Sequence, residues 1–347
     1  MPTSPRSPAL SVSLQQSLQE LGLLLAKRKS VQALLAPIVR ELALLRPTDI
    51  ARAEKEICDA ADLGFRWSGG PTVGWQQSHR LRAASQLKAM PDLAYLFIFH
   101  RDGNVREAAL RSLEGPMPGA FFATAIAWRM NDWVSQVRDA AAACAARSFA
   151  ITRPELLLET AWALFDRQNS WSRWGTDRDI VQELISRPDV VRLLLEQIIG
   201  AKSGPASRLL RQVLRGPTFD EHLTRIAREG MQPSVRAAAA QTLLEGRAAW
   251  IVGWQWRWID KIYGAGERVP RYQERSVGRP LSRHDLIDMF LTDKSAMVRR
   301  VALDGVMKFA LETDFARKWA ESTIGDRSPS VRERAEYILR KTSSTPT

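Results

Sequence analysis

The chain has 347 residues, 45% of them hydrophobic, and 50 lysines and arginines against 38 acidic residues leave a net charge of +12. This hydrophobic content is enough for a buried core and excludes a chain that is disordered throughout. The positive excess favours acidic partners: nucleic acid, anionic membrane or an acidic protein surface. Two cysteines, Cys58 and Cys144, are too few for a disulfide framework or a cysteine-rich zinc site, so we expect a reducing, cytoplasmic location.

The first elements predicted along the chain are a disordered segment over residues 1–9 and three amphipathic capping helices over residues 10–65. The N-terminal sequence lacks the basic stretch and long apolar stretch of a secretory signal. No later segment approaches the roughly 18 uncharged apolar residues that a membrane-spanning helix needs. We therefore expect a soluble protein without a membrane partner.

A repeated pattern follows, in which a short polar or proline-containing turn precedes Val-Arg and then small and apolar residues at helical spacing. It occurs in RDGNVREAALRSL (101–113), WVSQVRDAAAACAA (133–146), MQPSVRAAAAQTL (231–243), DKSAMVRRVALDGV (293–306) and DRSPSVRERAEYIL (326–339). Residues 92–109 also align without a gap on residues 285–302. The unit is a pair of helices whose apolar stripes are too narrow to be buried alone.

The predicted helix pairs cover residues 75–114, 117–148, 153–186, 188–216, 219–246, 285–310 and 314–341. Because no useful stretch alternates with a period of two, we predict an all-α fold, an α-solenoid of helical hairpins. The predicted repeats fill residues 75–246 and 284–341, with residues 247–283 as an insertion and residues 342–347 as a disordered tail.

These repeats resemble the HEAT-like class, in the variety named for phycobilisome lyases, whose second helix carries an acid, a turn and then Val-Arg-x-x-Ala. The resemblance covers most of residues 75–341 and implies HEAT-like helical hairpin repeats, which mostly mediate binding. It also implies a ladder of turn acids and helix arginines between neighbouring repeats. By motif match its members are Asp102 with Arg106, Asp132 with Arg138, Asp293 with Arg299, and Asp326 with Arg332. The turn before Arg236 lacks the acid, so the pattern does not predict the ladder there.

Residues 250–261 read WIVGWQWRWIDK and hold four of the twelve tryptophans. As part of a helix over residues 247–263, the segment places three tryptophans and three cations on one stripe: Trp250, Trp254, Trp258, Arg247, Arg257 and Lys261. Trp256 falls on the aliphatic face and is predicted to lie in the core. The stripe of three tryptophans and three cations can stack on bases through its indoles and bind anions through its arginine and lysine side chains. It also fits packing against the next repeat, with the cations reaching water.

Two further segments share this character. VGWQ occurs at 73–76 as well as at 252–255, and Trp75, His79 and Arg82 repeat the spacing of Trp254, Trp258 and Lys261. Residues 264–283 are predicted to be an exposed loop, rich in glycine, proline and arginine; its cations are Arg268, Arg271, Arg275, Arg279 and Arg283. A lesser candidate loop, residues 167–179, carries Trp171 and Trp174 beside arginines.

Catalytic and metal-binding patterns are not found. The four histidines lie apart, and the sequence contains no HExxH, GxSxG, Walker A or GxGxxG motif, so we predict no catalytic residue, no metal and no cofactor. Trp256 and Asp260 have a W-x-x-x-D spacing similar to that of the HEAT-like-repeat DNA glycosylases, which excise alkylated bases from a basic groove.

The function expected from these features is a non-enzymatic scaffold. It binds an acidic partner, in the first place a protein, through its concave face and the Trp/Arg-rich stripe. The alternative is a nucleic-acid-binding protein, with the DNA glycosylase as its catalytic extreme.

Overall fold

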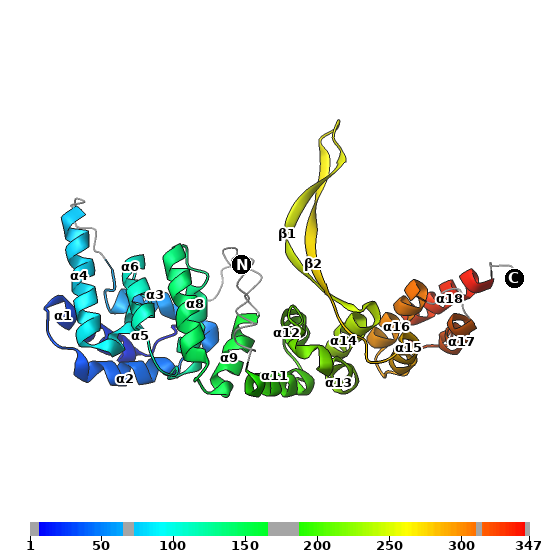
Figure 1. Cartoon of the computed structure of the whole chain (residues 1–347), viewed down its shortest axis with the longest axis horizontal. Helices are drawn as coiled ribbons and strands as arrows, with labels where there is room; N and C mark the ends of the chain where they lie inside the picture. The colour runs from blue at the N-terminus through cyan, green and yellow to red at the C-terminus, as the bar shows by residue number, and fades with distance from the viewer. Residues whose placement is uncertain (1–6, 65–72, 166–186, 310–313, 344–347) are drawn as a thin grey trace. The chain divides into compact units, whose positions relative to one another are not determined.

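A computed structural model describes residues 7–64, 73–165, 187–309 and 314–343 (Figure 1). Helix α4 is described from Val73, and its side chains from Leu81. The chain divides into two compact units, residues 1–190 and 191–347. Each unit is described by itself.

All secondary-structure elements described in the first unit are helices. Its elements are α1 (Val12–Ala26), α2 (Gln32–Ala43), η1 (Pro47–Asp49), α3 (Ile50–Ala60), α4 (Val73–Ala89), η2 (Pro91–Leu93), α5 (Ala94–Phe97), α6 (Gly103–Ser112), α7 (Ala120–Arg129), α8 (Ser135–Phe149) and α9 (Pro154–Phe165). Helices α6, α7 and α9 pack on neighbours: α6 and α7 on α8, and α9 on α7. The interior is formed by leucine, alanine and phenylalanine side chains such as Leu18, Phe121 and Phe122, which are fully buried.

The second unit combines helices with two long strands. Its elements are α11 (Pro188–Gly200), which begins at the boundary, α12 (Ala206–Val213), η4 (Pro217–His222), α13 (Leu223–Glu229), α14 (Pro233–Glu245), β1 (Arg247–Asp260), β2 (Ala265–Ser276), α15 (Arg283–Leu291), α16 (Ala296–Phe309), α17 (Asp314–Thr323) and α18 (Pro329–Ser343). Helix α16 packs on α14, and α18 packs on α16. The prediction of a mainly helical protein is therefore confirmed, and the strands are its exception.

A ladder of arginines and aspartates connects successive turns. Arg106 donates from Nε and Nη2 to the Asp132 carboxylate, at 2.9 and 2.8 Å, and Arg299 does the same to Asp326, at 2.7 and 2.8 Å. Nη1 of Arg106 donates to the His100 carbonyl at 2.8 Å, which belongs to the arginine's own turn. Each of these guanidinium groups thus holds its own turn and the following one.

Two members of the predicted ladder hold only their own turn among the contacts that the structure describes. Arg138 donates from Nη1 to the Asp132 carbonyl, and Arg332 to the Asp326 carbonyl. Arg236, for which no local acid predicted a partner, pairs with Asp293, which lies beyond both strands. Its side chain is 2% exposed.

The prediction of a helix over residues 247–263 and of a loop over 264–283 is wrong. Residues 247–260 form strand β1, and residues 265–276 pair with them as the antiparallel strand β2. The physical reason lies in the order W-Q-W-R-W, which alternates with a period of two and favours a strand, together with the β-branched and aromatic residues around it. Within the predicted loop, only Gly264 and the last part, from Val277 to Ser282, lie outside both strands and helix α15.

No helix within the described ranges is long and apolar enough to cross a membrane.

Candidate functional site

The foot of the β1–β2 hairpin is anchored to the helices by Arg275. Its guanidinium donates to the backbone carbonyls of Leu214, Arg215 and Gly216, and pairs with Asp220 through Nη1–Oδ2 and Nη2–Oδ1 distances of 2.8 and 2.6 Å. Arg275 was predicted to contact a partner. Its donors are instead directed to the protein's own loop.

Helix α14 turns directly into the hairpin at Gly246. This glycine has φ of +65°, a left-handed conformation that ends the helix at low cost, and its carbonyl accepts from Val277 N–H at 2.9 Å. Ala248 and Val277 are buried at the foot. Arg247 pairs with Glu245 and Glu274, so this cation too is used within the fold.

A bulge divides strand β1 into two parts, and the alternation of side chains between the two faces of the hairpin shifts by one residue at the bulge. Ile251 lies opposite Tyr272 and Gly253 lies opposite Arg271, so Val252 is an extra residue on β1. Since side chains alternate along β2, the register assigns each cross-strand pair to a face. Trp250, opposite Gln273, lies on the other face from the later tryptophans.

The face that we call the aromatic face carries four successive cross-strand pairs. They are Ile251 with Tyr272, Trp254 with Pro270, Trp256 with Arg268, and Trp258 with Gly266. The three tryptophan side chains are 55%, 55% and 50% exposed in chain order. The prediction that Trp256 belongs to the core is therefore wrong, and so is the grouping of Trp250 with Trp254 and Trp258.

Contacts within the aromatic face hold the indoles in defined positions. Trp256 and Trp258 meet edge to face with ring centroids 5.7 Å apart. The Arg268 guanidinium lies 5.6 Å from the centre of the Trp254 ring, a cation–π contact. Gly266 provides the room for this arrangement, because a Cβ at this position would overlap the indole of Trp256.

The opposite face is held by charges. Arg257 pairs with Glu267 directly across the strands, with Nε 3.0 Å from Oε1, so this predicted contact residue already has a carboxylate. Trp250 is half-buried and lies under the Arg215 guanidinium, 5.9 Å from the ring centre. Arg271 faces Gly253 and forms no ion pair with any carboxylate in the described part of the chain.

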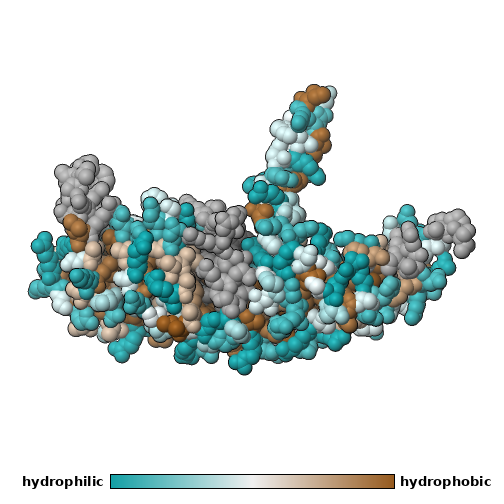
Figure 2. Space-filling view, in the orientation of Figure 1, coloured by the Kyte–Doolittle hydropathy of each residue, from teal (hydrophilic) through white to brown (hydrophobic). Residues whose placement is uncertain are grey.

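The tip of the hairpin is apolar. Ile259, Ile262 and Tyr263 are exposed, Ile262 to 90%, and Figure 2 shows hydrophobic residues at the outer end of the hairpin. The Asp260 carboxylate accepts hydrogen bonds from the backbone N–H groups of Ile262 and Tyr263, at 2.8 and 3.2 Å. Asp260 therefore shapes the turn.

The hairpin thus presents three cations without a carboxylate partner among the described residues: Lys261, Arg268 and Arg271. Three other cations of residues 247–276, at positions 247, 257 and 275, are paired. The aromatic face consequently lies next to positive charge that the fold leaves available.

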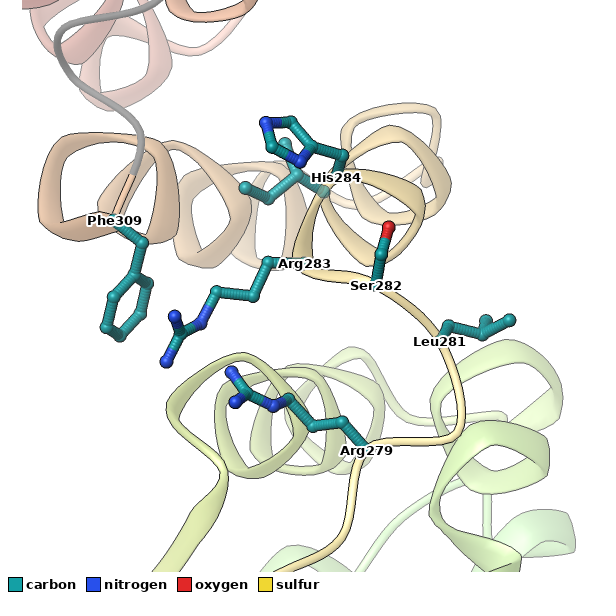
Figure 3. A pocket seen from close by; sticks show the side chains of 7 residues that line it. Arg279, Leu281, Ser282, Arg283, His284 and Phe309 are labelled. Atoms are coloured by element: carbon teal, nitrogen blue, oxygen red, sulfur yellow. The ribbon is translucent and has the colours of Figure 1, made fainter.

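A small basic pocket lies beyond β2, with a volume of about 420 Å³. It is lined by Arg279, Leu281, Ser282, Arg283, His284, Ile287 and Phe309. Figure 3 shows the guanidinium groups of Arg279 and Arg283 turned toward each other, with Phe309 beside Arg283 at 4.1 Å from ring centre to Cζ. Burial, and then the charge of Arg279, lower the pKa of Arg283.

Of the remaining predicted contact residues, the structure describes the side chain of Arg82 alone. The side chains of Trp75 and His79 lie outside the described residues, as do Trp171 and Trp174. Arg82 donates to the Leu25 and Ala26 carbonyls in the last turn of helix α1, and so has a structural role.

Several exposed residues were missed by the sequence reasoning, namely Ile251, Ile259, Ile262, Tyr263 and Tyr272. The alternation in residues 254–258 was the signal that could have found them, because a strand at 254–258 requires a partner strand after the Tyr-Gly turn.

The described residues include both cysteines and side chains of metal-ligating types. No cluster of three or more metal-ligating side chains occurs there. Burial raises the pKa of Cys58 to about 11 and also raises the pKa of Cys144, so both thiols are protonated at neutral pH. No protein-family model and no curated protein matches the sequence.

Proposed function

We propose that this protein is a non-enzymatic interaction protein, built of HEAT-like repeats arranged as an α-solenoid, that binds an acidic partner through the outer half of its β-hairpin. The observation that carries the proposal is the aromatic face, where Trp254, Trp256 and Trp258 are at least half exposed on one side of the hairpin. Large aromatic side chains in that state are typical of contact surfaces.

The repeat assignment is supported by the ladder. Arg106, Arg236 and Arg299 each pair with the aspartate of a later turn and hold the carbonyls of their own. Because Arg236 reaches Asp293, the hairpin is an insertion between two units that are successive in the ladder. Insertions in repeat proteins are often placed on a binding face.

The surface energetics favour a bound partner. An indole buries roughly 150–250 Å² when it is fully enclosed, so covering the exposed half of each tryptophan contributes about 2–3 kcal/mol. An isolated two-stranded hairpin is itself of marginal stability in water. A partner that covers the aromatic face would remove the exposed indole surface from water and would also stabilise the hairpin.

Charge supports an acidic partner. Lys261, Arg268 and Arg271 have no carboxylate partner within the described residues, and the whole chain carries +12. The basic pocket adds Arg279 and Arg283. Together these cations favour association with anions and raise its rate.

The test uses a shortened hairpin. Joining Ile251 to Tyr272 through an Asn-Gly turn removes the outer half but keeps the pairs from Arg247/Ser276 to Ile251/Tyr272 and the anchoring Arg275. Fluorescence anisotropy of labelled polyglutamate and of single- and double-stranded oligonucleotides, at about 50 and about 200 mM salt, measures binding to both proteins. We expect the full chain to bind at least one polymer and the shortened protein to bind it at least tenfold more weakly.

Equal binding by the two proteins, or binding of none of the polymers, contradicts the proposal. The thermal midpoint of the shortened protein is the control, and it should stay close to that of the full chain because the foot of the hairpin is retained.

A further inference from the structure

We propose that the acidic partner is a single-stranded nucleic acid whose bases stack on Trp254, Trp256 and Trp258 along the aromatic face. The inference rests on the proposed function and names the partner of the same surface. Two features of the hairpin carry it: the spacing of the indoles, and the position of cations that have no carboxylate partner among the described residues.

The spacing of the indoles matches that of a separated stack of bases. Alternate residues of an antiparallel strand are about 6.8 Å apart. Stacked bases are about 3.4 Å apart, so a ring inserted between two of them widens their separation to about 6.8 Å. Trp254, Trp256 and Trp258 therefore repeat along β1 at the interval at which bases and indoles can alternate.

Only a single strand presents its bases for this contact. In a duplex the base faces are covered by their neighbours, whereas an unpaired strand exposes them to aromatic side chains. The acidic side chains of a polypeptide offer carboxylates to the cations but no flat ring to the three indoles. The open aromatic face thus favours the single strand over the other acidic polymers.

Two cations lie where a sugar–phosphate backbone would run. Arg268 is on the aromatic face, opposite Trp256 and against the ring of Trp254. Lys261 follows the array at the tip, whereas Arg271 lies on the opposite face. Neither Arg268 nor Lys261 forms an ion pair with a carboxylate of the described chain, so binding a phosphate disrupts no existing pair.

Trp256 and Trp258 meet edge to face in the free protein, at 5.7 Å between ring centres and 78° between planes. A base stacked on either indole requires this pair to turn apart. Binding therefore predicts a spectroscopic change, the loss of the coupled far-ultraviolet circular dichroism band of the two indoles, together with quenching of tryptophan fluorescence.

The experiment titrates the full-length protein with labelled oligothymidylate, the matching duplex, polyglutamate and anionic vesicles at about 50 and about 200 mM salt. We expect oligothymidylate to bind most tightly. Trp254→Ala, Trp256→Ala and Trp258→Ala should each weaken it by about 5- to 150-fold, the range measured for a lost base–aromatic stack. The corresponding Phe variants should recover part of the affinity.

The matched control is Trp133→Ala, since this indole is 70% exposed but lies in the first unit, and it should leave binding unchanged. A second variant, Lys261→Gln, should lower the slope of log affinity against log salt by about 0.7, the value for one phosphate contact.

Tighter binding of the duplex or of vesicles overturns the inference, as does an equal loss in Trp133→Ala. If polyglutamate binds through the hairpin and oligothymidylate does not, the single-strand inference fails while the proposed function stands. If every polymer binds equally to the full chain and to the protein with the shortened hairpin, the single-strand inference and the proposed function both fail.

Discussion

Arg236 and Asp293 form a bidentate ion pair across 57 positions of sequence, with Nε–Oδ2 and Nη2–Oδ1 distances of 2.8 and 2.9 Å. Nη1 of the same guanidinium donates to the Gly230 carbonyl at 2.7 Å. One side chain therefore fastens the turn before α14 to the turn before α16, while both strands of the hairpin lie between them in sequence. The insertion leaves the helical packing continuous.

Removing this pair should destabilise the second unit strongly. Arg236→Ala leaves the mostly buried Asp293 carboxylate without its partner, and the loss of one member of a buried pair costs about 3–5 kcal/mol. Denaturant unfolding followed by tryptophan fluorescence measures the free energy of unfolding. The control is Arg225→Ala, which removes an exposed pair with Glu196 and should cost less than about 1 kcal/mol. Equal effects of the two variants would contradict the ladder's role.

The ladder also predicts a loss of stability in acid. Hydrogen bonds from Arg299 hold the pKa of Asp326 below its ordinary value. Burial alone would raise the pKa of Asp293, but hydrogen bonds from Arg236 and Ser295 outweigh it and lower this pKa as well. A depressed folded-state pKa gives stability that is present above the unfolded value, about 3.9, and is lost as the pH falls through the folded value.

We therefore expect the free energy of unfolding to be nearly constant between about pH 7 and about pH 5 and to fall below about pH 4. Denaturant titrations across this range measure it. Asp326→Asn should be less stable at neutral pH and should decline less steeply in acid. A parallel decline in the variant and the natural chain would show that Asp326 is not linked to stability.

Gly266 should be required for the position of the Trp256 indole. Gly266→Val adds a side chain where a Cβ already overlaps the ring, so the Trp256–Trp258 pair should separate. Circular dichroism of the coupled indoles measures the change. Gly253→Ala is the matched control on the opposite strand, because nothing lies within 4 Å of a Cβ at that position. A spectrum that changes in Gly253→Ala and not in Gly266→Val would contradict this arrangement.

Arg275 should determine whether the hairpin stays attached. Arg275→Ala leaves three backbone carbonyls without their donor and Asp220 without its cation, at a cost of about 1–3 kcal/mol. Hydrogen exchange should become faster in residues 247–251 and 272–276, while α16 to α18 keep their protection. Arg271→Ala, which removes a cation without an ion pair in the described chain, should change exchange little.

The helical framework was largely predictable because its signals are local. The Val-Arg repeats carry helix period, turn residues and the ladder arginines within about thirteen residues each, and Arg106, Arg236 and Arg299 occupy the same place in each repeat. The partner of Arg236 could not be found from local sequence, because it lies beyond the insertion. Asp293 was recognised as a ladder acid, but only the tertiary structure pairs it with Arg236.

For the tryptophan segment, the spacing of Trp250, Trp254 and Trp258 fits one face of a helix and one face of a strand equally well. Offsets of four and eight residues bring Trp250, Trp254 and Trp258 to one face of a helix and are also even, as a strand requires. Trp256, two residues from its neighbours, separates the two cases: a helix places it on the far side and a strand places it with Trp254 and Trp258.

By itself, the sequence determined a basic, mainly helical protein with an aromatic and arginine-rich insertion, because composition and helical period are properties of neighbouring residues. The tertiary structure decided that the insertion is a hairpin, since a strand is defined by its hydrogen-bonded partner and not by its own residues. It also decided that the bulge at Val252 turns Trp250 away from the later tryptophans, because one unpaired residue reverses the facing of all that precede it.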